Sequence, residues 1–203
     1  MENSVRFLFS GDSALVIEFG NEISVDINKK IRKMMDDIKK ENIDGIVELV
    51  PTYCSLLINY DVLKIDYNTL VEKLKTFLNN DLETAEGEEV TLVEIPTLYN
   101  DEFGPDLSYV AEYNKLSKEE VIKIHTGTDY LVYMLGFMPG FTYLGGMSEK
   151  IATPRLESPR LQIYSGSVGI AGKQTGMYPS ISPGGWRIIG RTPLKLYNPD
   201  SDT

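Results

Sequence analysis

Two arginines, each directly after a proline, stand five residues apart in the segment Thr153–Arg160, which reads TPRLESPR. Because a proline fixes its own backbone dihedral φ, it stiffens the chain next to Arg155 and Arg160. The planar guanidinium group of arginine can form two parallel hydrogen bonds to a carboxylate or a phosphate. The pattern predicts a site for an anion, and a pair of solvated loop charges is the alternative that the spacing leaves open.

A second candidate site is the segment Pro183-Gly184-Gly185-Trp186-Arg187, which holds the only tryptophan of the chain. Glycine has no Cβ, so a ligand or another chain can approach the backbone closely at such a turn. Gly184, Gly185 and Trp186 are therefore candidates for substrate contact. A tight turn beside a core tryptophan is the alternative.

The single histidine, His125, lies at the end of a segment that we expect to be helical. A histidine titrates near neutral pH and can transfer protons. At the C-terminus of a helix, however, it can simply interact with the helix dipole, and both interpretations stay open. One histidine and one cysteine exclude a site with several histidine or thiolate ligands, so we expect no metal site and a packing role for Cys54.

The segment Gly166–Gln174, GSVGIAGKQ, resembles a phosphate-binding loop only superficially. A Walker A loop needs a glycine, four further residues, and then Gly-Lys-Ser/Thr at the start of a helix. Here the glycine comes one residue too early, Gln174 follows Lys173, and Val168 and Ile170 predict a strand. We conclude that this is not a Walker A motif.

The charge of the chain is unevenly distributed. The whole sequence has a formal net charge of −10, which argues against a nucleic-acid partner and against an anionic membrane surface. Residues 130–198, by contrast, contain seven Lys or Arg against two Glu, together with 11 of the 17 glycines. A local excess of cations favours an anionic ligand there. The single cysteine and the absence of a visible signal peptide predict a cytoplasmic protein.

The elements that would position these residues fall into two groups. In the first group, apolar residues at helical spacing predict a helix over Val25–Glu41 with Ser24 as its N-cap, and a second helix around Leu70–Leu78. Short β-rich runs predict four strands, at Val5–Phe9, Ala14–Phe19, Ile46–Val50 and Cys54–Tyr60. The order β-β-α-β-β-α predicts a ferredoxin-like α+β domain over residues 1–85.

The acidic segment Asp81–Glu89 is typical of a linker, and Thr91–Leu98 is expected to be the first strand of a second domain, residues 86–203. Ser117 and Glu120 form the pattern of a capping box, which predicts a short helix that carries His125. The uncharged segment Tyr130–Ser148 contains a Pro-Gly pair near its middle, so we do not expect it to span a membrane. Further strands are expected at Tyr130–Leu135, Leu161–Tyr164, Val168–Ile170, Trp186–Ile189 and Leu194–Tyr197, the pattern of a small β-barrel or sandwich.

Four ordered segments, Gly136–Met147, Thr153–Arg160, Gly166–Pro179 and Ser182–Leu194, resemble the family of 5-oxoprolinase B subunits, whose members are also described as allophanate hydrolase subunit 1 or as KipI-type sensor-kinase inhibitors. The resemblance implies a ferredoxin-like domain followed by a mainly-β cyclophilin-like barrel. It also implies a further pair of strands after Tyr197, so we expect the barrel to lack its C-terminal closing strands in this chain.

The resemblance further implies one subunit of an ATP-dependent 5-oxoprolinase, which opens 5-oxoproline to glutamate together with a homologous C subunit and a separate A subunit. We expect this chain to be inactive alone, with ATP as co-substrate and Mg²⁺ bound to it. The expected roles are substrate or phosphate binding by Arg155 and Arg160, with Gly184, Gly185, Trp186 and Arg191 as further substrate contacts. Lys173 and Gln174 would approach the reacting oxygens, and His125 and Tyr143 would handle or orient protons. The alternative function is a regulatory protein that binds and inhibits a sensor histidine kinase.

Overall fold

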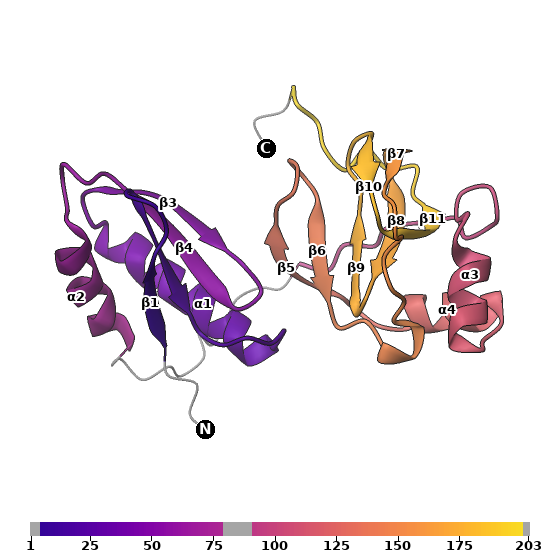
Figure 1. Ribbon diagram of the computed structural model, residues 1–203, viewed down its shortest axis with the longest axis horizontal. Coiled ribbons are helices and arrows are strands. Elements are labelled where there is room, and N and C mark those ends of the chain that lie inside the picture. Colours follow the sequence, from indigo (N-terminus) through magenta and orange to yellow (C-terminus); the bar gives the residue numbers. More distant parts are fainter. Residues whose placement is uncertain (1–4, 79–90, 201–203) are drawn as a thin grey trace. The chain divides into compact units, whose positions relative to one another are not determined.

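Two units make up the chain, Met1–Thr91 and Leu92–Thr203, and the computed structural model describes residues 5–78 and 91–200 of it (Figure 1). The predicted domain boundary at residue 85 and the predicted linker Asp81–Glu89 lie outside the described residues. None of the described helices is both long and apolar enough to cross a bilayer.

The first unit is an α+β unit with the predicted order of elements. Its strands form one antiparallel sheet in the order β1-β2-β4-β3. The elements are β1 (Arg6–Phe9), β2 (Ala14–Glu18), α1 (Val25–Glu41), β3 (Ile46–Pro51), β4 (Ser55–Tyr60) and α2 (Tyr67–Leu78).

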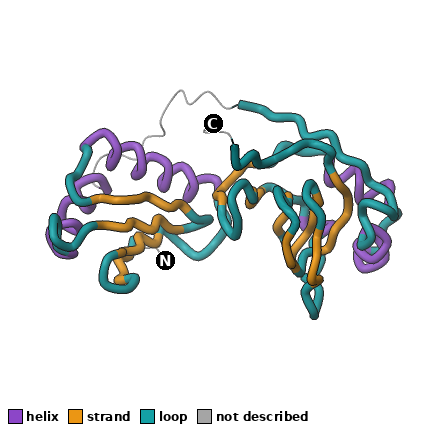
Figure 2. The backbone as a smooth tube through the Cα atoms, turned by 90° about the horizontal axis from the view of Figure 1, so that it is seen from above, coloured by secondary structure: helices purple, strands orange, loops and turns teal. Residues whose placement is uncertain are grey.

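Period-two alternation places Leu15, Ile17, Leu56 and Ile58 on one face of this sheet, where all four are fully buried. The apolar faces of α1 and α2 belong to the same core cluster, so both helices cover that face, and Figure 2 shows α1 running along the strands. Ser24 is the N-cap of α1 as predicted, but its side chain forms no capping hydrogen bond.

The second unit is mainly β and contains two short helices. It has a five-stranded antiparallel sheet in the order β11-β8-β9-β6-β5 and a two-stranded ribbon, β10-β7. The elements are α3 (Leu107–Asn114), α4 (Lys118–Thr126), β5 (Leu131–Leu135), β6 (Thr142–Gly145), the 3₁₀ turn η1 (Glu149–Ile151), β7 (Arg160–Ile163), β8 (Ser167–Ala171), β9 (Gln174–Met177), β10 (Ser182–Gly184) and β11 (Arg187–Arg191).

Strand β8 is buried along its whole length and divides this unit into two cores. Val168 and Ile170 pack against α3 and α4, which lie next to each other in Figure 1. The alternate residue Ala171 belongs to a separate core of aromatic side chains on the opposite face. The two faces of the sheet therefore have different surroundings, and this determines which of the predicted site residues can meet.

Several details differ from the predictions. Thr91–Leu98 is not a strand, because only Leu98 pairs with another segment, as an isolated bridge to Arg191. Leu194–Tyr197 is not a strand either; it follows Pro193, which has no N–H for a ladder. Helix α3 and strands β6, β9 and β10 were not predicted. The capping box of Ser117 and Glu120 is confirmed at the start of α4.

Candidate functional site

The aromatic face of the second unit is built around Trp186. Gly169 on β8 and Gly176 on β9 are register partners, and the tryptophan packs over both of them. A Cβ atom on Gly176 would lie 3.0 Å from Cζ3 of the indole and 2.7 Å from the carbonyl oxygen of Thr142. The sheet therefore needs a glycine at this position to hold the tryptophan.

Three further aromatic residues surround this indole, which is only 5% exposed. Phe141 and Trp186 meet edge to face with ring centroids 5.4 Å apart, and Tyr143 and Tyr178 lie at 6.0 and 6.5 Å. Edge-to-face pairs of this kind are favourable because the positive edge of one ring meets the negative face of the other. The tryptophan is thus held in one position.

Arg155 lies over this cluster, with its Cζ atom 5.7 Å from the centroid of Trp186. Its side chain is exposed, and no described carboxylate lies within ion-pair distance of it. A guanidinium group over an aromatic face retains its hydrogen-bond donors for another partner. Arg155 is therefore available to bind an anion.

Arg160, the second predicted arginine, is already paired. Its Nη1 and Nη2 atoms donate hydrogen bonds to Oδ2 and Oδ1 of Asp106, at 2.7 and 2.8 Å, and this raises the pKa of Arg160. Asp106 is buried, and the Nη1 atom of Arg187 lies 3.7 Å from its Oδ1 atom. The predicted contact of Arg160 with a substrate stays a prediction, and this ion pair does not favour it.

Tyr178 is a site residue that sequence reasoning missed. Its phenol lies near the guanidinium groups of Arg155 and Arg160 and accepts a hydrogen bond from the backbone of Trp186. Burial raises the pKa of Tyr178 to about 12, although this hydrogen bond and both arginines act in the opposite direction. At neutral pH the phenol is protonated, so it can donate a hydrogen bond. The only signal in the sequence is its place in the segment Gly166–Pro179.

The two glycines before Trp186 differ in how much space surrounds them. A Cβ atom on Gly184 would lie 2.5 Å from the hydroxyl oxygen of Tyr178, whereas one on Gly185 would meet nothing closer than 3.8 Å. Gly184 is therefore required by packing. Gly185 accepts a hydrogen bond from the backbone of Leu156, at 2.8 Å, through its carbonyl oxygen.

His125 lies on the opposite face of the sheet. Its Nε2 and Nδ1 atoms are hydrogen bonded to Thr175 Oγ1 and to the hydroxyl of Tyr99, each at 2.9 Å. Thr175 precedes Gly176 on β9, so their side-chain positions face opposite sides. Burial lowers the pKa of His125 to about 4, which leaves the ring neutral at pH 7. The structure therefore does not bring His125 together with Trp186, and its role in proton transfer stays a prediction.

Lys173 and Gln174 lie where β8 turns into β9. Lys173 forms an exposed ion pair with Glu149, 2.6 Å long. By alternation Gln174 shares the face of Gly176, and Gly172 pairs with Thr153 just ahead of Arg155. The turn therefore lies beside the arginine segment.

Arg191 lies elsewhere in this unit. Its Nε atom donates to the carbonyl oxygen of Ser165 at 2.8 Å, and its guanidinium group stacks on Tyr164 at 5.2 Å. Together with Lys195 it lines an open hollow of about 340 Å³, whose other lining residues are Leu98, Phe103, Ser165, Thr192, Pro193 and Leu194.

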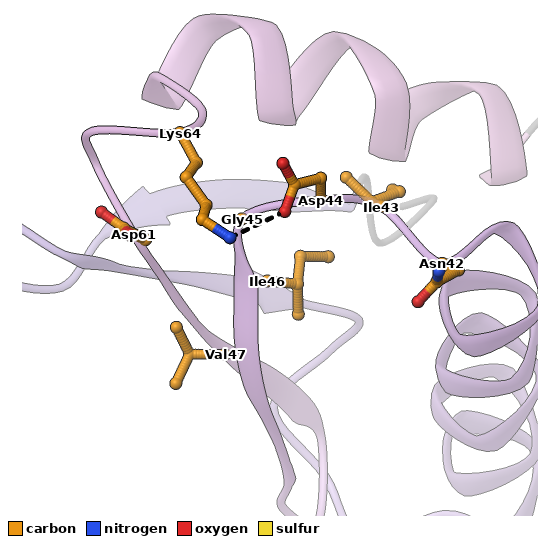
Figure 3. Close-up of a pocket in the computed structure, with 8 residues that line it drawn as sticks. All are labelled: Asn42, Ile43, Asp44, Gly45, Ile46, Val47, Asp61 and Lys64. Carbon is orange, nitrogen blue, oxygen red and sulfur yellow. Dashed lines mark hydrogen bonds and ion pairs between the residues drawn. The ribbon is translucent and has the colours of Figure 1, made fainter.

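The first unit also has an open hollow, of about 390 Å³, shown in Figure 3. Lys64 lines this hollow and points toward Asp44, with its Nζ atom 3.0 Å from Oδ1 of the carboxylate. This hydrogen bond lowers the pKa of Asp44. None of the predicted site residues lines this hollow. No group of three or more His, Cys, Asp or Glu side chains that could hold a metal ion occurs among residues 5–78 and 91–200.

Comparison with known proteins gives consistent matches over nearly the whole chain. A sequence profile of the family described as carboxyltransferase domain, subdomain C and D, matches residues 5–203. The 5-oxoprolinase B subunit of Bacillus subtilis is 47% identical over 201 residues, which cover 95% of this chain and 84% of the relative. The protein of the same name from Escherichia coli is 36% identical over 200 residues, 97% of this chain and 88% of the relative. Among solved structures, a conserved uncharacterized protein from Pyrococcus horikoshii is 52% identical with a TM-score of 0.53, and the match covers 97% of this chain and 89% of that one.

Proposed function

Because the chain belongs to the carboxyltransferase family of subdomains C and D, and within it to the 5-oxoprolinase B subunits, we propose that it is one subunit of an ATP-dependent 5-oxoprolinase. The enzyme would open the lactam of 5-oxoproline to give glutamate. The chain would act with a C subunit and an A subunit and would be inactive alone.

An amide carbonyl is a poor electrophile, and this is the reason for the use of ATP. Transfer of the terminal phosphoryl group of ATP to the lactam oxygen would make the ring carbon electrophilic. Water would then add to that carbon, and the ring C–N bond would break to give the free amine and an acyl phosphate. A second water molecule would hydrolyse this acyl phosphate to the carboxylate of glutamate and phosphate. Positioned cations stabilise the charge that develops in such a transfer.

The observation that carries the proposal is the exposed guanidinium group of Arg155 above Trp186. The substrate carries a carboxylate, and this arginine has free donors beside the phenol of Tyr178. Arg155 would hold the carboxylate, and Tyr178 would donate a further hydrogen bond to the bound substrate.

Three further predicted residues receive supporting roles. Lys173 and Gln174 would approach the lactam or phosphoryl oxygens, which requires Lys173 to exchange its exposed partner Glu149. Tyr143 would orient a proton or a water molecule. Mg²⁺ would arrive on the phosphates of ATP, and because the described residues supply no acidic ligand set, we assign it no ligand in this chain.

The turn between β5 and β6 is a suitable contact for a partner protein. Phe137 at this turn is 62% exposed, and its φ of 66° is rarely adopted by a bulky residue. Three backbone hydrogen bonds within Gly136–Phe141 hold the turn in this conformation. A strained and exposed aromatic residue is typical of a binding contact, and we place the C subunit here.

We further propose that the first unit is ferredoxin-like and that the second is a cyclophilin-like barrel. The antiparallel sheet with both helices on one face supports the first assignment. The five-stranded sheet with the β10-β7 ribbon supports the second. The cytoplasmic location stays a prediction.

The deciding experiment measures ATP-dependent release of glutamate from 5-oxoproline. The chain alone is expected to release none, and the mixture with its C and A partners is expected to turn over. Omission of this chain from the mixture should abolish turnover. No release from the full mixture, combined with tight binding to a sensor histidine kinase and inhibition of its autophosphorylation, would overturn the proposal in favour of a regulatory protein.

A further inference from the structure

Asp106 occupies the N-cap position of α3, yet its side chain forms no capping hydrogen bond. An aspartate at this position usually accepts a hydrogen bond from the first turn of its helix. Here Oδ2 accepts from Nη1 of Arg160 and from the backbone N–H of Ile188, both at 2.7 Å, and Oδ1 accepts from Nη2 of Arg160. The carboxylate therefore binds β11 and Arg160 and does not cap its own helix.

We propose that Asp106 is the positioning residue for the anion site at Arg155, an inference that rests on the proposed function. Asp106 acts through Arg187, whose Nη1 atom lies 3.7 Å from its Oδ1 atom. The guanidinium group of Arg187 stacks on Tyr109, with Cζ 3.7 Å from the ring centroid, and its Nε atom donates to the carbonyl oxygen of Pro154 at 3.3 Å. Pro154 directly precedes Arg155.

The other side of Arg155 is held by the same strand end. The backbone N–H of Leu156 donates to the carbonyl oxygen of Gly185 at 2.8 Å. Gly185 leads into Trp186 and β11, and β11 is fixed to Asp106 at Ile188 by two hydrogen bonds. The backbone N–H of Ile188 donates to the side chain of Asp106, and the backbone N–H of Asp106 donates to the carbonyl oxygen of Ile188, at 2.9 Å. Both neighbours of Arg155 are therefore held by groups that Asp106 fixes.

Asp106 also decides which arginine is free. The side chain of Asp106 is only 6% exposed. Its carboxylate is paired with the guanidinium groups of Arg160 and Arg187. A carboxylate that is buried in this way needs paired and hydrogen-bonded partners to offset its lost hydration. Arg155 lies outside this cluster. The arrangement thus leaves one guanidinium group for the substrate carboxylate and gives the other two a structural role.

A double-mutant cycle tests the proposal, since residues that act through one another give non-additive effects. The variants are Asp106→Asn, Arg155→Gln and the combination of both. Asp101→Asn is the matched control, because its ion pair with Lys118 is exposed. The readouts are the emission of Trp186, the only tryptophan, on titration of the chain with 5-oxoproline, and the KM for 5-oxoproline in the complex.

Asp106→Asn is expected to weaken 5-oxoproline binding and raise KM by about tenfold, with a smaller change in kcat. In the Arg155→Gln background, Asp106→Asn should have no further effect. Asp101→Asn should match the wild type. Independent losses that multiply in the double variant would overturn the proposal while leaving the proposed function intact. A wild-type complex that does not turn over would instead overturn the proposed function.

Amide hydrogen exchange tests the positioning without a substrate. In Asp106→Asn, the amide of Leu156 should exchange at least about tenfold faster. The amide of Leu116, which donates to Ala111 at the end of α3, should be unchanged. Equal acceleration at both amides, or no acceleration at Leu156, would contradict the proposal. If Asp106→Asn does not fold, Arg187→Lys keeps the charge but removes the Nε donor to Pro154, and the same pattern of exchange is expected.

Discussion

Gly169 and Gly176 face each other across β8 and β9, and Trp186 packs over the space that their missing side chains leave. The position of the tryptophan, over which Arg155 lies, therefore depends on two residues that have no functional group of their own. This relationship links the stability of the second unit to the geometry of its site.

Gly176→Ala is expected to destabilise the second unit by about 1–3 kcal/mol, because the new methyl group would overlap the carbonyl oxygen of Thr142 and the indole of Trp186. Gly185→Ala is the matched control, since a Cβ atom there meets only ordinary contacts. The free energy of unfolding of both variants is measured by chemical denaturation, with the fluorescence of Trp186 as the signal. Equal stability of the two variants would show that Gly176 does not set the position of the indole.

Alanine substitutions at Arg155 and Arg160 should have different effects. Arg155→Ala is expected to lower oxoprolinase turnover in the reconstituted complex more than about tenfold with little change in stability, because this side chain is exposed. Arg160→Ala is expected to lower the free energy of unfolding by about 1–3 kcal/mol, because it leaves the buried carboxylate of Asp106 with fewer partners. Near-wild-type turnover of Arg155→Ala would contradict its assignment as the carboxylate ligand.

The stability of the chain should depend on the protonation of His125. Its pKa is lowered from 6.5 to about 4 in the folded protein, so the unfolded chain binds the proton more readily between these values. The stabilisation is fully present above pH 6.5 and is lost as the pH falls toward 4, by about 2 kcal/mol between pH 7 and pH 5.

Denaturation of the wild type and of His125→Asn at both pH values measures this contribution. The carboxylates common to both proteins cancel in the comparison. The variant should lose less stability on acidification than the wild type. An identical loss in both proteins would show that His125 is accessible to protons in the folded state.

Phe137→Ala is expected to weaken association with the C subunit at least about tenfold, because exposed aromatic residues commonly dominate such contacts. Leu161→Ala is the matched control, since Leu161 on β7 is 94% exposed in the same unit. Titration of the labelled C subunit with each variant gives the dissociation constants. Equal affinity of the Phe137→Ala variant and the wild type would show that this turn does not contact the C subunit.

Features with a local cause could be predicted from the sequence. The apolar spacing of α1 gave its bounds, and the reciprocal pattern of Ser117 and Glu120 gave the start of α4. Both depend on residues within a few positions of each other. The pattern of arginines after prolines, equally local, marked the segment in which the exposed Arg155 lies.

Contacts between distant residues could not be predicted in this way. Asp106 and Arg160 are separated by 54 positions, and nothing in a single sequence shows that one pairs with the other. Helix α3 was missed because it has only eight residues and its N-cap aspartate is used for another contact. The separation of His125 from Trp186 depends on which face of β9 each contacts, which becomes visible only once β9 itself is known.

Strand β8, with every residue buried, separates the helical core from the aromatic core. Substitutions around Arg155 on the aromatic side can therefore alter the ligand site without changing how Val168 and Ile170 pack against α3 and α4, whereas Asp106 at the N-cap of α3 links the two sides. Away from Asp106, such a division lets selection act on substrate choice and on folding as nearly independent traits. Among relatives of this chain, sequence differences on the aromatic side should then follow differences in ligand, while those on the helical side should follow growth temperature.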